Sequence, residues 1–466
     1  MRLGRAPVGL SVFIAAGCSA GQGITPGAPD ATSDVAVDVD AAPASPDAGA
    51  VDVAYVEPSS DASIANPCSL PGSVQFTSSG MVVVSGGSAN PDLTFLHLPV
   101  GFCAHYYGMV GNARQLRFAP GGELFVASPT TGTTGAGPGG QSAIVVLPDD
   151  NHDGVADVPV CSTSGGPTCV KFLSNLPSTQ ALLFANHRFY YQDNTKIMSV
   201  PYSAGDRAPS AGATQVADIT VYVSNTHWPK TLDVADDGTI YVGNGGDQGE
   251  ACDSTRPFHG GILKLDGTPG GTPVARGFRN PISVRCARGK NTCFALELGM
   301  DYSWSQGGHE KLVPIRSGDD WGYPCCATQN VPFDNVAAAI CANTTPDTNS
   351  FVIGDTPFGV DFDPGNWPAP WGGNAFVATH GVVGSWVGAR IIAIVVDRNT
   401  ALMMPSTDVT GSSMSYQDQG AMTDFATGWE DHAHGRPSAV TFSGDGRLFV
   451  ANDQNGTIFW IAPMKL

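Results

Sequence analysis

Apolar residues recur along this chain in short alternating segments separated by glycine, aspartate, asparagine or proline. The stretch KTLDVADDGTIYVGN (230–244) alternates through Leu232 and Val234, turns at Asp-Asp-Gly, and resumes through Ile240 and Val242. Alternation with a period of two on both sides of a turn predicts a β-hairpin.

The same unit occurs six times, at 114–128, 180–192, 230–244, 282–297, 359–380 and 438–453. A third apolar segment follows most copies, as in AIVVLPDD, KIMSVPY, GILKLDG, RIIAIVV and TIFWIAP. Repeated groups of three or four antiparallel strands predict an all-β fold, a six-bladed β-propeller, which leaves no long open edge. Residues 92–108 would supply the outer strand that closes the ring. A β-sandwich is the alternative, but it does not require six copies with matching turns.

The amino-terminal segment has a different composition from the repeats. In residues 1–18, two arginines precede a short apolar stretch, and small residues precede Cys18, which is the layout of a secretory signal peptide. Ala-Ala-Gly-Cys resembles the bacterial lipobox, so we expect Cys18 to be lipidated and to anchor the protein in the outer membrane; a plain signal peptide is the alternative. Residues 19–66 are rich in Ala, Pro, Asp and Ser and contain no Lys or Arg, which predicts a disordered tether. The propeller should occupy residues 67–466.

Charge and cysteine content narrow the possible partners and the compartment. The formal net charge is −19, which makes nucleic acid an unfavourable partner. No apolar run after residue 20 is long enough to cross a bilayer, so membrane contact is expected only through the lipid. Without Cys18 ten cysteines remain, an even number that predicts disulfides in an oxidising compartment. Local pairing is expected for Cys161 with Cys169 and for Cys286 with Cys293. A third cluster consists of Cys325, Cys326 and Cys341. The remaining cysteines, Cys68, Cys103 and Cys252, would pair with this cluster or with each other. Metal binding is the alternative, but no CxxC pair is present.

Polar residues stand immediately before several of the predicted innermost strands. They are Asn112-Ala113-Arg114, His227-Trp228, Gly277-Phe278-Arg279-Asn280-Pro281 and His434-Gly435-Arg436-Pro437. In a propeller these lead-in positions face the central channel at one end, where sites are assembled from several blades. We therefore expect a ring of charged and hydrogen-bonding groups there.

Several of these segments also carry a family resemblance. LPVGFCAHYYGMVGNARQLRFAPGGELFVAS, HWPKTLDVADDGTIYVGNGGDQ, GFRNPISV, SGDDWGYP, FVATHG and HGRPSAVTFSGDGRLFVANDQNGTIFWI, in this order over residues 98–462, resemble the L-sorbosone dehydrogenase and soluble aldose sugar dehydrogenase group. That group consists of six-bladed propellers that use pyrroloquinoline quinone (PQQ). The resemblance implies an oxidoreductase that converts an aldose or sugar aldehyde to a lactone or acid and passes electrons to an external acceptor.

The resemblance also implies roles for individual residues. His227 would be the general base that takes the proton from the anomeric hydroxyl. Arg279 and Asn280 would contact the reacting quinone oxygens, and Arg436, with Arg114, would hold the cofactor carboxylates. His380 matches a further position of the cofactor site. Ca²⁺ would be held by the backbone carbonyls of Gly299 and Met300.

A second calcium signal comes from spacing alone. DDNHDGVAD places oxygen-bearing side chains at alternate positions around Gly154, namely Asp149, Asn151, Asp153 and Asp157. This pattern predicts a structural Ca²⁺ site; the alternative is a solvated acidic loop between the first two blades.

Two other functions fit parts of the same pattern. A propeller that has lost the cofactor could bind carbohydrate or protein at the channel mouth, and tryptophans in loops, such as Trp228 and Trp386, would suit sugar stacking. A calcium-dependent lactone hydrolase would need carboxylates on a central ion, for which Asp301, Asp319 and Asp320 are available. Only the dehydrogenase requires Arg279, Arg436 and another cation to converge on one pocket.

Overall fold

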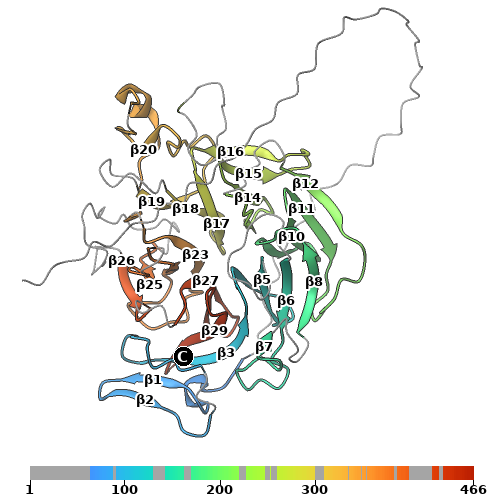
Figure 1. Cartoon of the computed structure of the whole chain (residues 1–466), viewed down its shortest axis with the longest axis vertical. Coiled ribbons are helices and arrows are strands. Elements are labelled where there is room, and N and C mark those ends of the chain that lie inside the picture. Colours follow the sequence, from blue (N-terminus) through green and yellow to red (C-terminus); the bar gives the residue numbers. More distant parts are fainter. Residues whose placement is uncertain are drawn as a thin grey trace, which may run out of the picture. The chain divides into compact units, whose positions relative to one another are not determined.

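In the computed structural model of this protein, most of the described strands belong to six mainly antiparallel sheets placed radially around a common axis (Figure 1). The structure describes residues 63–87, 91–129, 142–161, 169–219, 227–246, 252, 260–299, 309–333, 335–347, 349–352, 354–382, 386–397, 422–429 and 434–465. The expected six-bladed propeller is confirmed. Cys18, the residue predicted to be lipidated, and almost all of the predicted tether lie outside the described residues.

We number the blades in chain order and give their strands from the innermost outward. Blade 1 consists of β4 (Gln115–Phe118), β5 (Leu124–Ser128), β6 (Ser142–Leu147) and β8 (Val170–Leu176); blade 2 of β9 (Leu182–Ala185), β10 (Arg188–Asp193), β11 (Lys196–Pro201) and β12 (Thr214–Asp218); blade 3 of β13 (Leu232–Val234), β14 (Ile240–Asn244), β15 (Gly261–Leu265) and β16 (Thr272–Arg276). Blade 4 consists of β17 (Asn280–Ala287), β18 (Thr292–Leu298), β19 (His309–Pro314) and β22 (Ser350–Val352); blade 5 of β23 (Pro357–Phe362), β24 (Ala375–Thr379), β25 (Arg390–Ile394) and β26 (Met422–Ala426); blade 6 of β27 (Pro437–Phe442), β28 (Leu448–Asn452), β29 (Thr457–Pro463) and β3 (Phe102–Val110).

The ring closes by joining the two ends of the propeller in one sheet. Strand β3 pairs with β29, as expected for the segment 92–108, so the blue start of the propeller lies beside its red end (Figure 1). The innermost strands contact one another in the cyclic order β4, β9, β13, β17, β23, β27 and back to β4. All six therefore line one axis.

Glycine explains why the first hairpin turns in the same way in several blades. Gly122, Gly238 and Gly446 occupy matching turns and have φ values of 93°, 85° and 84°. Glycine adopts this left-handed region without the steric cost that a Cβ brings. The turn positions that revealed the repeat are thus required by backbone geometry.

The core lies between adjacent blades, where apolar side chains from facing sheets pack together. Between blades 1 and 2, Phe125, Phe184 and Phe189 lie with ring centroids 4.8–5.4 Å apart. Fully burying one such side chain contributes about 1.5–3 kcal/mol. This packing fixes the blade angles and therefore the lead-in residues at the axis.

Smaller elements decorate the propeller. They are η2 (Pro67–Ser69), the hairpin of β1 (Val74–Thr77) and β2 (Gly80–Val83) that extends blade 6, β7 (Val160–Cys161), the hairpin of β20 (Cys326–Thr328) and β21 (Val331–Pro332), and η5 (Ala338–Asn343). No helix in the described ranges has the length and apolar character needed to span a membrane.

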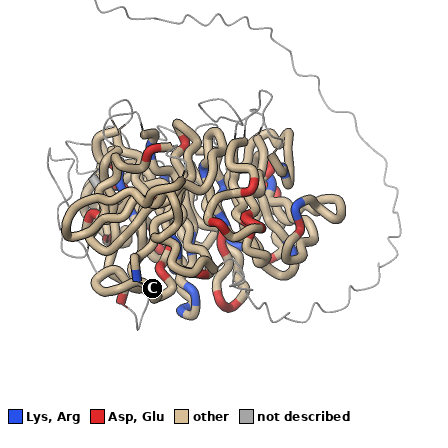
Figure 2. Tube along the Cα trace, turned by 90° about the horizontal axis from the view of Figure 1, so that it is seen from below, with Lys and Arg blue, Asp and Glu red and all other residues tan. Residues whose placement is uncertain are grey.

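Five disulfides join described residues: Cys68–Cys103, Cys161–Cys169, Cys252–Cys325, Cys286–Cys293 and Cys326–Cys341. The two expected local pairs are confirmed, and the third cluster divides between one internal bridge and one bridge to Cys252. Bridges of this number persist in oxidising compartments, which indicates secretion. Charged residues of both signs are spread along a mostly neutral trace (Figure 2).

Candidate functional site

The lead-in residues of all six blades meet at one end of the central channel. The axial cavity is lined by residues from every innermost strand or the residues just before it, including Arg114, Gln180, Thr231, Ile282, Phe358 and Ala439. Because the innermost strands all begin at this end, we call it the entry end. His227, Arg279 and Arg436 each lie a few residues at most before an innermost strand, which puts them towards this end, whereas Arg114 lines the axial cavity itself.

His227 is held in one tautomer. Its side chain is buried, and Nδ1 lies 2.6 Å from the carbonyl oxygen of Gly246. Since a carbonyl oxygen only accepts, Nδ1 carries the proton, and in the neutral ring Nε2 bears the lone pair. Gly245 packs so tightly here that a Cβ on it would collide with the Cβ of His227.

Arg279 is anchored beside His227 through the same turn. Its carbonyl accepts the Gly246 N–H at 2.9 Å, and its own N–H donates to Glu297 Oε1 at 2.8 Å. The guanidinium Nη1 donates to the Gly299 carbonyl at 2.6 Å. The Gly299 oxygen predicted to bind Ca²⁺ therefore accepts from a cationic group, and Met300 lies outside the described residues.

Glu297 links Arg279 to a buried lysine. Its Oε2 lies 3.8 Å from Lys311 Nζ, and Lys311 also lies 3.6 Å from Asp347. Burial raises the pKa of Glu297 to about 7, against the lowering effect of Lys311 and of the Arg279 N–H. The sequence does not single out Glu297, because its two partners, Arg279 and Lys311, come from other segments of the chain.

A second group of cations meets around Asp453, which directly follows β28. Arg436 donates to both carboxylate oxygens, with Nε–Oδ1 at 2.8 Å and Nη2–Oδ2 at 2.9 Å. Arg114 Nε lies 3.1 Å from Oδ2 of the same residue. Asp453 is fully buried as a side chain, so this is a desolvated charge cluster rather than a surface ion pair.

His380 completes this cluster. Its Nε2 lies 3.7 Å from Asp453 Oδ2, and its ring stacks on Phe358 with centroids 3.9 Å apart. Burial lowers the pKa of His380 well below its usual value, and the positive charges of Arg436 and Arg114 add to the effect. His380 is therefore neutral. The structure thus brings Arg114, Arg436 and His380 together, as the resemblance implied.

Several polar atoms at the entry end are buried without a hydrogen-bond partner among the described residues. They are Asn112 Nδ2, Gln180 Oε1, Asn244 Nδ2 and Oδ1, Asn280 Oδ1 and His380 Nε2. Leaving such groups unpaired costs about 1–3 kcal/mol each. A polar ligand would satisfy them. Asn244 was not expected from the sequence, although it ends β14 at this same end of the channel.

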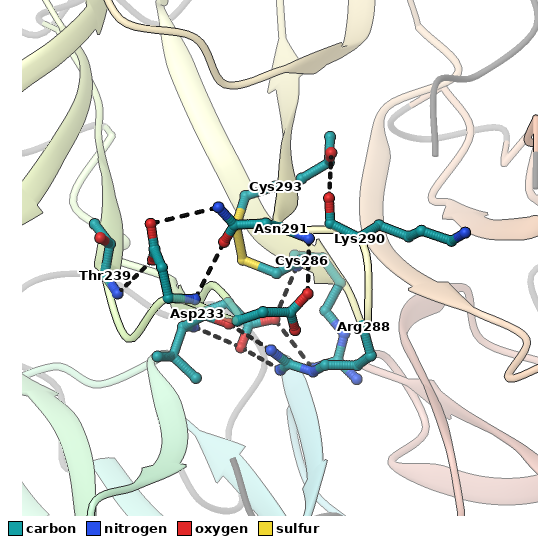
Figure 3. The surroundings of a disulfide bond; sticks show 12 residues. Asp233, Thr239, Cys286, Arg288, Lys290, Asn291 and Cys293 are labelled. Atoms are coloured by element: carbon teal, nitrogen blue, oxygen red, sulfur yellow. Dashed lines mark hydrogen bonds and ion pairs between the residues drawn. A yellow bond between two sulfur atoms is a disulfide. The ribbon is translucent and has the colours of Figure 1, made fainter. Parts of the chain in front are cut away.

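The far end of the channel is closed by charges. Asp233, on β13, accepts from Arg288 at 2.7 Å and from the Cys286 N–H at 2.9 Å (Figure 3). It also accepts from Arg117 on β4 at 2.7 Å. Arg285 binds Asp361 in a bidentate manner at 2.7 and 2.6 Å. These ion pairs engage most of the charged groups at the far end, although Arg117 Nη1 is also buried without a hydrogen-bond partner among the described residues.

The acidic loop lies inside blade 1, between β6 and β8, and not between the first two blades as expected. Asp149 accepts the N–H groups of Asp153 and Gly154 at 3.1 and 3.0 Å, and Asp157 accepts that of Asp150 at 3.0 Å. Asn151 Oδ1 also accepts the Asp153 N–H, at 3.0 Å. No group of three or more His, Cys, Asp or Glu side chains within the described ranges is placed to hold a metal ion. Calcium binding by this loop stays a prediction.

Fold and site together define a six-bladed propeller with a polar channel mouth. No family model matches the sequence, and no curated protein is significantly similar to it. Solved structures do match. A Trichoderma reesei enzyme of carbohydrate-active family AA12 is 16% identical, with 81% of this chain and 100% of that chain covered and a TM-score of 0.61.

Two further structures are similar over most of their length. The PQQ domain of pyranose dehydrogenase from Coprinopsis cinerea, in its holo form, is 16% identical over 78% of this chain and 96% of that chain, with a TM-score of 0.56. The soluble aldose sugar dehydrogenase of Escherichia coli is 14% identical over 78% and 99%, with a TM-score of 0.53. The resemblance to soluble PQQ-dependent sugar dehydrogenases is thus confirmed at the level of the fold.

Proposed function

We propose that this protein is a secreted, PQQ-dependent dehydrogenase that oxidises an aldose or sugar aldehyde to a lactone or acid. Support comes from the shared fold of proteins described as pyranose dehydrogenase and aldose sugar dehydrogenase. It also comes from the chemistry of the entry end, where Arg114 lines the axial cavity, where His227, Arg279 and Arg436 lie in the segments that lead into innermost strands, and where several buried amides have no partner among the described residues.

The residues present fit a planar, polyanionic cofactor. PQQ offers carboxylates and carbonyl oxygens, which match the guanidinium groups of Arg114 and Arg436 and the unpaired amides of Asn280 and Asn244. Its carboxylates would lie at the two arginines, and its quinone oxygens would lie near Arg279 and Asn280. When bound, PQQ supplies a two-electron acceptor for the sugar's anomeric carbon.

His227 performs the acid-base step. Its Nδ1 proton is committed to Gly246, so Nε2 accepts the proton of the anomeric hydroxyl. Arg279 lies beside it on the Gly246 turn and stabilises negative charge on an oxygen at the same place. Electrons then pass to an external acceptor.

Calcium at Gly299 fits less well than the cofactor. The Gly299 carbonyl already accepts Nη1 of Arg279, a cationic donor, at 2.6 Å. A calcium structure is known for the AA12 enzyme of Trichoderma reesei, which is 16% identical to this chain. We derive no step of the reaction from a metal at this position.

The observation that carries the proposal is the pairing of His227, in its Nδ1-protonated tautomer, with Arg279 at a channel mouth that also presents Arg114. The test titrates purified protein with PQQ, with and without Ca²⁺, and follows dye reduction with a panel of aldoses and sugar aldehydes. Uptake of PQQ and sugar-dependent reduction support the proposal. Absence of PQQ uptake would overturn it and favour a propeller that binds its ligand without redox chemistry.

A further inference from the structure

Asp453 contacts two arginines in the same manner. Arg436 uses Nε and Nη2, and Arg114 uses Nε, which it shares with Asn112 Oδ1 at 3.0 Å. In both cases the carboxylate holds the inner edge of the guanidinium, the edge that carries Nε.

Holding the inner edge leaves the outer nitrogens available. Neither Nη1 nor Nη2 of Arg114, nor Nη1 of Arg436, has a hydrogen-bond partner within the part of the chain that the structure describes. Arg114 also lines the axial cavity. An Arg fork whose plane is fixed at one edge presents its remaining donors in a set direction.

Aromatic rings fix the planes of both guanidinium groups. The Arg114 guanidinium carbon lies 5.0 Å from the centroid of Phe358, and that of Arg436 lies 5.0 Å from the centroid of Trp386. His380 stacks on the same Phe358 ring at 3.9 Å. Carboxylate and ring together leave each fork little rotational freedom.

The charges of the cluster do not cancel. Two guanidinium groups face one carboxylate, and His380 is neutral, so one positive charge remains in a buried environment. Buried charges are stable when they are paired, and a second carboxylate from a ligand would pair this one.

We propose that Asp453 is a positioning residue that orients Arg114 and Arg436 so that their outer nitrogens bind a single carboxylate group of a ligand at the entry end. The carboxylate belongs to the quinone cofactor or to an acidic sugar. The first source rests on the proposed function; the second does not.

The decisive variant is Asp453→Asn, because two explanations predict opposite results. If Asp453 merely competes with the ligand for the arginines, removing its charge tightens carboxylate binding. If it positions them, the variant binds more weakly although the site has become more positive. We expect affinity to fall at least tenfold, measured for PQQ by absorbance titration and for D-gluconate by calorimetry.

Two further variants guard against a trivial loss of folding. Asp361→Asn alters another buried carboxylate, which also binds an arginine, Arg285, in a bidentate manner, and it should leave both affinities unchanged. Arg114→Lys keeps the positive charge at the entry end but removes the Nε edge of the guanidinium that Asp453 holds. It should therefore weaken carboxylate binding severalfold, and it tests the proposal independently if Asp453→Asn does not fold. Unchanged binding by Arg114→Lys would show that charge alone suffices and would overturn the proposal.

The two ligands separate this inference from the proposed function. Gluconate binding that depends on Asp453, without any uptake of PQQ, would support the positioning role and overturn the redox function. Uptake of PQQ that is as tight or tighter in Asp453→Asn would overturn the positioning role alone. Failure of the unaltered protein to bind either carboxylate would overturn this inference.

Discussion

The carbonyl oxygen of Gly246 accepts the Nδ1 proton of His227 at 2.6 Å. The same residue's N–H donates to the carbonyl of Arg279 at 2.9 Å, so the backbone of one glycine sets both the tautomer of the imidazole and the position of the neighbouring arginine. A hydrogen bond from one ring nitrogen of a histidine commonly fixes the orientation and tautomer in which the other nitrogen acts as a base. The turn after β14 therefore acts on the site without providing a side chain to it.

Replacing His227 by alanine should abolish proton transfer while leaving the cofactor's carboxylate contacts in place. We expect the turnover rate to fall about 10²–10⁴-fold, the usual contribution of a general base, with PQQ affinity changed little. Stopped-flow reduction of the loaded protein by sugar measures this directly. His105→Ala is the matched control, since His105 is also buried but stacks on Trp460, away from the channel. An equal loss in both variants would contradict a catalytic role for His227.

Gly245→Ala should disturb the site without changing any polar group. A Cβ there would collide with the His227 Cβ and would lie 2.8 Å from the His227 carbonyl and 3.1 Å from that of Arg279. Either His227 or the turn must move, and a displacement near 1 Å is enough to reduce rates about 10²-fold. Steady-state kinetics and thermal unfolding should be compared with Gly212→Ala, where an added Cβ meets no neighbouring atom. Normal activity in Gly245→Ala would show that this close contact does not control the site.

The fold was predictable because its information is local. Alternation and turn residues recur in each hairpin, and a chain that repeats them six times can bury its apolar faces only between neighbouring blades. The lead-in residues His227, Arg279 and Arg436 were singled out for the same reason, since each lies a few residues at most before the next innermost strand.

Contacts between distant segments could not be predicted in this way. Asp453 ends the last copy of the repeat and Arg114 begins the first, and only closure of the ring through β3 and β29 brings them together. Glu297 reads as an ordinary strand residue until Arg279 and Lys311 are placed beside it. The β1–β2 hairpin was also missed, because it lies outside the repeat.

Calcium should stabilise blade 1 if the acidic loop binds it. In the present arrangement Asp153 Oδ1 accepts the Val155 N–H at 2.9 Å and Asn151 Nδ2 donates to Asp153 Oδ2 at 3.0 Å, contacts that a metal would replace. A ligand that binds only the folded state at a hundred times its dissociation constant adds about 2.7 kcal/mol. Thermal unfolding with Ca²⁺ and with chelator should therefore differ in the unaltered protein and coincide in Asp153→Asn. Identical curves for the unaltered protein would contradict calcium binding.

Asp355 should make the stability of the protein depend on pH in a direction that its ion pair alone would not suggest. It lies 3.1 Å from Arg390 Nη2, yet burial outweighs the arginine and raises its pKa from 3.8 to about 6. The folded state therefore binds this proton more tightly than the unfolded state, so the group's contribution to stability is largest below about pH 4 and declines as the pH rises towards about 6.

Asp355→Asn removes this dependence, because asparagine does not titrate. Relative to the unaltered protein, the variant should gain stability between about pH 4 and pH 6, on the order of 2–3 kcal/mol, and change little above that range. Denaturant midpoints of both proteins at several pH values measure the difference in stability. A difference that is the same at every pH would contradict the raised pKa of Asp355. A variant that becomes less stable than the unaltered protein as the pH rises would show that Arg390 instead holds the pKa of Asp355 below its usual value.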